Sequence, residues 1–226
     1  MILKQLQGKL ESQYDLDIPY DVTRFVSYDT EIARTLSEGA CNGNGYEQDM
    51  DIEVVFVRQY NDTLEFTLYL NEALVESMDQ FQNQAMDKQN HKVEASAPSV
   101  DDVCAVVEGV SHAVCLLWHA HNDRQIRPVD LELQAEVDKF MLLLNQQQTQ
   151  PKQLHRQLFS ECRLTPASDS PVFDRYKTAN NLAARYCAWL SDNFIEADDT
   201  AGMDRELARF YRRSGYAKFE YINDLH

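Results

Sequence analysis

Residues 101–145 read DDVCAVVEGVSHAVCLLWHAHNDRQIRPVDLELQAEVDKFMLLLN, and this stretch decides the fold that the sequence predicts. Apolar residues recur at intervals of three and four on both sides of a short polar turn, which predicts two long helices. The first helix is expected to begin after Pro98, where Ser99 and Asp102 have the spacing of a reciprocal cap. The second helix is expected to begin just after Pro128, because proline is tolerated in the first helical turn.

The first of these helices carries a row of polar side chains opposite its valine-rich face. The row comprises Asp101, Cys104, Glu108, His112, Cys115 and His119. Residues three and four apart are neighbours on a helix surface, so these groups form one stripe. Carboxylates, thiols and imidazoles are the donor types that bind transition-metal ions. Three interpretations stay open: a solvent-facing side of the helix, a metal or catalytic site, and a buried hydrogen-bond network.

The second helix offers two further carboxylates, Glu132 and Glu136, along the margin of its apolar face. Together with Glu108 and His112 they predict a carboxylate-rich divalent-metal site between two facing helices. Four-helix di-iron proteins build sites of this kind, but they use Glu-x-x-His pairs with a spacing of three. Here the spacing is four and no second Glu/His pair is present, so the match is partial. Such ligands suit Mg²⁺ or Mn²⁺, and the histidine also admits Fe or Zn²⁺.

The rest of the chain predicts an α+β fold, a predominantly α-helical bundle with a small N-terminal lobe that contains a β-hairpin. The hairpin is expected from residues 51–58, which are rich in β-branched side chains, and 63–70, where apolar and polar residues alternate. The predicted boundaries are an acidic lobe at residues 1–82, a linker or long loop at 83–98, and a helical domain at 99–226. The segment 83–98 is assigned to a linker because it lacks apolar periodicity.

Further helices are expected on either side of the hairpin and after the central pair. Apolar periodicity predicts them near residues 2–13, 21–38, 72–82, 171–193 and 201–213, with others that begin at Pro151 and that carry Phe219. Residues 41–49, CNGNGYEQD, contain Asn-Gly pairs and predict a turn-rich loop. That loop has neither a P-loop nor a GxGxxG pattern, which argues against a phosphate cradle.

The chain is strongly acidic, with 37 Asp and Glu against 21 Lys and Arg and a formal net charge of −16. Residues 1–100 carry 18 acidic and 7 basic side chains, whereas residues 101–226 carry 19 and 14. This charge argues against binding to nucleic acid or to anionic membranes, because both require basic patches. It favours a basic protein partner for the acidic surface.

A basic row is predicted on the helix near the C-terminus, formed by Arg205, Arg209, Arg212 and Arg213. The spacing of the first three places them on one helix face. Because the guanidinium fork suits carboxylate and phosphate, this row is a candidate contact for an acidic partner segment or an anionic ligand. The alternative is a solvated face, or pairing with the protein's own acidic side chains.

Common catalytic signatures are missing from the sequence, which has no HExxH, GxSxG or CxxC and no nucleotide-binding loop. Five scattered cysteines predict reduced thiols. Neither an apolar leader nor a stretch of about 18 apolar residues is evident in the sequence. Together these features predict a cytoplasmic protein. The sequence therefore predicts a non-catalytic cytoplasmic protein, an adaptor or regulator that acts through protein–protein contacts. The alternative is a metal-dependent hydrolase or oxidase with the carboxylate and histidine site.

Overall fold

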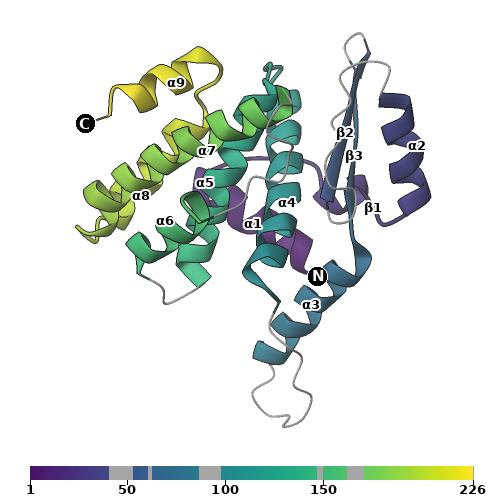
Figure 1. The fold of residues 1–226 in the computed structure, drawn as a ribbon, viewed down its shortest axis with the longest axis horizontal. Coiled ribbons are helices and arrows are strands. Elements are labelled where there is room, and N and C mark those ends of the chain that lie inside the picture. The colour runs from purple at the N-terminus through teal and green to yellow at the C-terminus, as the bar shows by residue number, and fades with distance from the viewer. Residues whose placement is uncertain (41–52, 61–62, 87–97, 147–149, 162–170, 226) are drawn as a thin grey trace. The chain divides into compact units, whose positions relative to one another are not determined.

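The computed structural model describes residues 1–40, 53–60, 63–86, 98–146, 150–161 and 171–225. In these residues the chain is mostly helical, with nine α-helices and one three-stranded sheet (Figure 1). The predicted α+β, mostly helical fold is confirmed. The chain divides into two compact units. Unit 1 comprises Met1–Gly8 and Pro19–Ala113, and unit 2 comprises Lys9–Ile18 and Val114–His226, so that helices α1 and α4 contribute to both.

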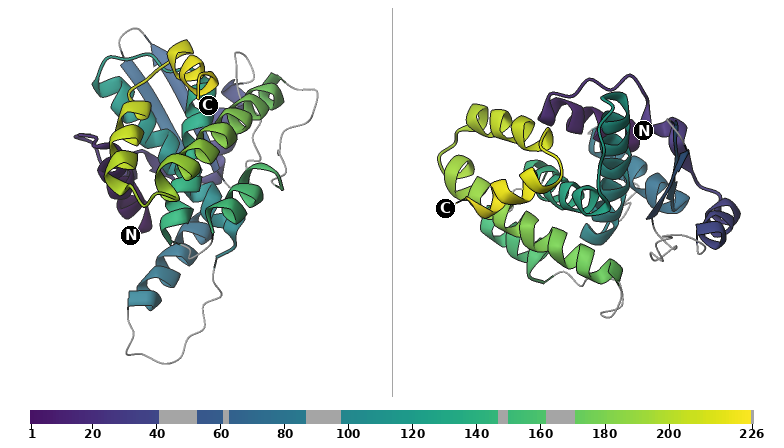
Figure 2. Two further views of the ribbon diagram at one scale, coloured as in Figure 1. Left: turned by 90° about the vertical axis from the view of Figure 1, so that its left-hand side faces the viewer. Right: turned by 90° about the horizontal axis from the view of Figure 1, so that it is seen from above.

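Unit 1 contains the sheet and the helices around it. In chain order its elements are the start of α1 (Ile2–Tyr14), the 3-10 turn η1 (Val22–Phe25), β1 (Val26–Ser27), α2 (Thr30–Ala40), β2 (Glu53–Tyr60), β3 (Thr63–Leu70), α3 (Glu72–Met86) and the first part of α4 (Val100–His121). The strand order is β1-β3-β2, in which β3 is parallel to β1 and antiparallel to β2. Figures 1 and 2 show the sheet between α2 and α4.

The predicted hairpin is confirmed, and its register decides which side chains face α4. Glu53 lies opposite Leu70 and Val55 lies opposite Leu68 across the antiparallel pair. Since directly opposed residues share a face of the sheet, Glu53 belongs to the same face as Leu68 and Leu70, which are fully buried. Strand β2 extends to Tyr60, two residues further than predicted. The register therefore carries one acidic side chain into the apolar face of the sheet.

Helix α4 begins with the cap that the sequence predicts. The backbone N–H of Asp102 donates to Ser99 Oγ and the backbone N–H of Ser99 donates to Asp102 Oδ2, both at 3.1 Å. Every residue from Gly109 to His119 is buried. The solvent-facing interpretation of the polar stripe is therefore wrong for this part of the helix, because tertiary packing covers it on all sides.

The described residues of unit 2 form helices joined by turns, with no strand among them. Its elements after α4 are α5 (Pro128–Gln146), α6 (Pro151–Phe159), α7 (Pro171–Leu190), a π-helical turn η2 (Ser191–Ile195), α8 (Thr200–Tyr211) and α9 (Tyr216–Asn223). Helix α5 packs against α6 and α7, and α7 also contacts α9. Three of these helices begin at prolines, in agreement with the sequence. The predicted helix end near residue 193 falls inside the π-helical turn.

Three sequence expectations differ from the structure or fall outside it. The segment 21–38 contains strand β1 as well as helix, because Val26 pairs with Leu68 through a two-residue contact that leaves no periodic signal. Helix α3 runs to Met86, four residues into the predicted linker. The remaining linker residues up to 97, the loop 41–49, Cys41 and Cys162 lie outside the described residues.

Candidate metal centre

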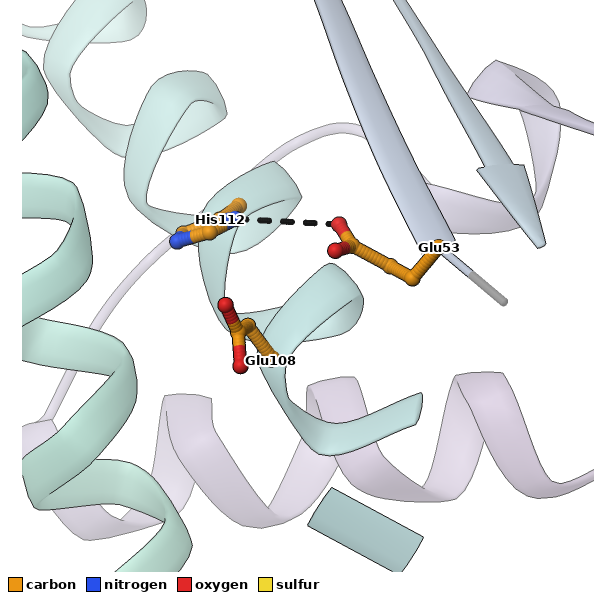
Figure 3. Close-up of side chains that lie close together, drawn as sticks. All are labelled: Glu53, Glu108 and His112. Carbon is orange, nitrogen blue, oxygen red and sulfur yellow. Dashed lines mark ion pairs between the residues drawn. The ribbon is translucent and has the colours of Figure 1, made fainter. Parts of the chain in front are cut away.

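Three side chains of unit 1 converge where the sheet meets helix α4. Glu53 is the first residue of β2, and Glu108 and His112 lie one turn apart on α4. One ligand atom from each residue lies within 4.8 Å of the other two. Figure 3 shows the three side chains pointing toward one another from the strand and the helix. We call this cluster the triad.

The triad is shielded from water and rich in carboxylate. The side chains of Glu53 and His112 are 7 % and 5 % exposed, and His112 Nδ1 lies 3.7 Å from Glu53 Oε1. Glu108 is half-buried beside them. Two carboxylates that face each other in low dielectric repel, so a positive charge held between them stabilises the arrangement. A protonated imidazole supplies one such charge, and a metal ion supplies more.

The donor set of the triad fits a divalent metal ion. Carboxylate oxygen and imidazole nitrogen bind Zn²⁺ at about 2.0–2.2 Å, which places neighbouring ligand atoms about 3–3.5 Å apart. The three ligand atoms lie within 4.8 Å of one another. Shifts of about 1 Å, the scale of a side-chain adjustment, bring them to the separation that a bound Zn²⁺ requires. A mixed oxygen and nitrogen set without thiolate suits Mn²⁺, Fe²⁺ and Zn²⁺.

The four metal ligands predicted from the sequence divide between the two units. Glu108 and His112 come together in unit 1, with Glu53 as their neighbour. In unit 2, Glu132 Oε1 lies 3.3 Å from Arg175 Nε and Glu136 Oε1 lies 2.7 Å from Lys139 Nζ. A site of all four predicted residues stays a prediction. The triad instead takes its third ligand from a strand.

Glu53 is the residue that sequence reasoning missed. The β-branched composition of residues 51–58 predicts a strand but does not show which face carries its acidic residues. The signal was present in the hairpin, because pairing with the alternating segment 63–70 sets Glu53 opposite the inward-facing Leu70. A register for the hairpin would therefore have pointed to a buried carboxylate.

Unit 2 has a buried polar network of its own, formed by Tyr14, Gln134, Asp138 and Lys218. Tyr14 Oη donates to Asp138 Oδ1, and Gln134 Nε2 donates to the same oxygen at 2.9 Å. Lys218 Nζ donates to Gln134 Oε1 at 2.8 Å. Burial lowers the pKa of Lys218, while burial and the Asp138 carboxylate raise the pKa of Tyr14. We call this chain of hydrogen bonds the unit 2 network.

A thiol and an imidazole also meet on the last turns of α4. Cys115 Sγ lies 3.6 Å from His119 Nδ1, and that nitrogen lies 2.8 Å from the carbonyl oxygen of Cys115. Burial raises the pKa of Cys115 to about 12 and lowers the pKa of His119 to about 4. The proton therefore stays on sulfur and the ring stays neutral. Since the thiolate is the nucleophile, this pair is not activated for attack.

The arginines predicted to contact a partner make several bonds within unit 2. Arg209 Nη2 donates to the buried Glu206 at 2.7 Å, and the Arg213 guanidinium lies 4.1 Å from the centre of the Tyr221 ring. Arg212 Nη1 donates to the carbonyl of Tyr14, the last residue of α1, at 2.9 Å, where a cation suits the helix end.

Arg205 is exposed on the same helix, α8. The contact of this row with an acidic partner or an anion stays a prediction, as does the binding of a basic protein to the acidic surface. A steep fall of affinity with salt is the behaviour to look for in either case.

Comparison of the sequence with known protein families, with curated proteins and with solved structures finds no match. One described helix, α4, is long and apolar enough to cross a membrane, by its length and composition only. The expectation that the chain has no stretch long and apolar enough for a membrane span therefore does not hold for α4. Within the structure, 72 % of its apolar window is buried, as in the core helix of a folded domain.

Proposed function

We propose that the protein binds one divalent transition-metal ion through Glu53, Glu108 and His112. The observation that carries this proposal is the convergence of three ligand atoms within 4.8 Å of one another at a largely buried position. The ligand types support it, because carboxylate and imidazole are ligands of Mn²⁺, Fe²⁺ and Zn²⁺.

Among the residues that the structure describes, three ligands converge, a number that favours a metal-dependent enzyme over a purely structural metal site. Structural zinc sites are closed by four protein ligands, whereas catalytic sites use three and leave a position for water or substrate. With Zn²⁺ or Mn²⁺ such a site activates water for hydrolysis, and with Fe²⁺ it supports oxidation. The identity of the bound metal therefore selects between the two reaction classes.

The test is metal titration of the metal-free protein, with elemental analysis of freshly purified protein beside it. Isothermal titration with Zn²⁺ and with Mn²⁺ is expected to give about one site per chain, because the described residues contain one such triad. His112→Ala is expected to remove that site. His121→Ala is the matched control, because His121 lies on the same helix but is exposed, and this variant is expected to bind metal like the wild type.

Two results would contradict the proposal. The first is a wild-type protein that takes up neither metal. The second is a His112→Ala variant that loses stability while its metal content stays the same, since that outcome assigns the triad to a buried polar network that only fixes the helix and strand register.

A further inference from the structure

We infer that Gly109 is the positioning residue of the metal site, because its missing side chain is what lets Glu53 reach Glu108 and His112. The inference rests on the proposed metal-binding function and adds a residue that is not itself a ligand. Gly109 directly follows Glu108 on α4, and it is buried. Glycine disfavours a helix interior, so a buried helical glycine calls for a packing reason.

The packing reason is the close approach of the sheet. A Cβ atom placed at Gly109 would lie 2.9 Å from Glu53 Cγ, 2.9 Å from Leu68 Cδ1 and 3.1 Å from Leu70 Cδ2. The first two distances are shorter than real Cβ contacts allow, so something must shift. All three neighbours come from the hairpin, on the face of the sheet that carries Glu53. The contact at Gly109 therefore sets how near β2 lies to α4.

A methyl group at position 109 acts unequally on the three ligands. Glu108 and His112 keep their spacing, because both belong to α4 and the helix is compatible with alanine. Glu53 belongs to the strand and is the ligand whose Cγ meets the new methyl group. The variant is therefore expected to keep two ligands and displace the third.

The experiment compares Gly109→Ala with Gly8→Ala in the metal-free protein. Gly8 lies in a helix of the same unit, and a Cβ atom there meets nothing within 4 Å. Zn²⁺ affinity is measured by isothermal titration, and the visible spectrum of the Co²⁺-loaded protein reports the coordination sphere. Gly109→Ala is expected to weaken Zn²⁺ binding by about 10- to 100-fold or more, the range seen when groups that orient ligands are removed, and to change the Co²⁺ spectrum. Gly8→Ala is expected to match the wild type in both measurements.

A second pair of variants keeps the test informative if Gly109→Ala folds poorly. Leu68→Ala removes one of the two neighbours closest to the new methyl group, so in Gly109→Ala/Leu68→Ala the remaining close neighbours are Glu53 Cγ at 2.9 Å and Leu70 Cδ2 at 3.1 Å. Circular dichroism confirms that both variants are folded before titration. The Zn²⁺ affinity of Leu68→Ala alone is the reference value for this pair. The double variant is expected to lose about tenfold or more relative to it, because Glu53 is still displaced.

The outcomes separate the two proposals. A wild-type protein that binds no metal overturns the proposed function, and with it this inference. A wild-type protein that binds metal, together with a folded Gly109→Ala variant of unchanged affinity and Co²⁺ spectrum, overturns the positioning role alone. Equal affinities of Leu68→Ala and the double variant overturn it as well.

Discussion

The triad of unit 1 and the unit 2 network are both buried and polar, yet they are built from different charges. In the unit 2 network one carboxylate and one amine are joined through an amide, and donors meet acceptors from Tyr14 to Lys218. The triad sets two carboxylates beside a single imidazole. Its three side chains offer carboxylate oxygen and imidazole nitrogen atoms, which are metal-ligand types.

The two clusters are therefore expected to play different roles. A network in which charges and hydrogen bonds balance stabilises one arrangement of the chain, and here it joins residues that are up to 204 positions apart, from Tyr14 to Lys218. Carboxylate oxygen and imidazole nitrogen atoms that converge at a largely buried position are of the types that bind a metal cation. We therefore expect the unit 2 network to respond to mutation through stability, and the triad to respond through metal binding.

The largest expected effect is on the unit 2 network. Asp138→Ala removes the acceptor of both Tyr14 and Gln134, and breaking a buried charged network by removing one partner costs about 3–5 kcal/mol of unfolding free energy. Urea denaturation followed by circular dichroism measures the loss. Asp138→Asn keeps one acceptor oxygen and is expected to lose less. A loss below about 1 kcal/mol for Asp138→Ala would refute the structural role of the network.

A pH dependence follows from His119, whose pKa is lowered to about 4 mainly by burial. Between pH 6.5 and 4 the unfolded chain binds a proton at this histidine that the folded chain does not, so stability falls as pH falls. The loss from this group reaches roughly 3 kcal/mol at pH 4.

Urea titrations across this pH range, carried out on two variants, isolate the contribution of His119. His119→Gln is expected to lose roughly 3 kcal/mol less unfolding free energy than the wild type between pH 6.5 and pH 4. His121→Gln changes an exposed position on the same helix and is expected to lose as much as the wild type. Identical pH profiles for the two variants would show that His119 is not held neutral by burial.

Metal-linked stability separates the two clusters. If the triad binds metal in the folded state only, Zn²⁺ at about 100 times its Kd raises the unfolding free energy of the wild type by about 2.7 kcal/mol. Glu53→Gln is expected to abolish this rise, because the amide is a poorer metal ligand than the carboxylate. Asp138→Asn is expected to show the full rise from a lower starting stability. A rise that survives in Glu53→Gln would place the metal elsewhere.

The smallest expected effect comes from Gly8 and Gly109, two helical glycines of unit 1. Gly8→Ala is expected to raise the unfolding free energy by about 0.5–1 kcal/mol, since the site is open and alanine is the better helix former. Gly109→Ala is expected to lower it, because its methyl group meets Glu53 and Leu68. Denaturant titration of the metal-free proteins checks both signs. Stabilisation by Gly109→Ala would mean that the sheet yields easily at this contact.

Local signals in the sequence predict much of the fold. Three of these signals depend only on neighbours in the chain. They are the cap formed by Ser99 and Asp102, the prolines that begin α5, α6 and α7, and the alternation in residues 63–70. Such signals do not report what a helix packs against. The burial of His112 and the strand pairing of Val26 come from contacts with segments more than 40 residues away.

The candidate metal site also shows that local sequence signals do not report tertiary contacts. Glu108 and His112 were predicted as ligands because their spacing places them on one side of a helix. Glu53 was missed because its role depends on the hairpin register and on the close approach of the sheet to Gly109. The register depends on how the two strands pair and the close approach depends on tertiary packing, so residues 51–58 taken alone indicate neither.

X-ray absorption spectroscopy of the Zn²⁺-loaded protein tests the triad most directly. Ligation by Glu53, Glu108 and His112 predicts oxygen and nitrogen scatterers at about 2.0–2.2 Å, including the signature of one imidazole, and no sulfur. His112→Ala is expected not to bind Zn²⁺ at this site, so this spectrum is expected to be lost in that variant. A sulfur shell at about 2.3 Å, or an imidazole signature that persists in His112→Ala, would contradict the triad as the metal site.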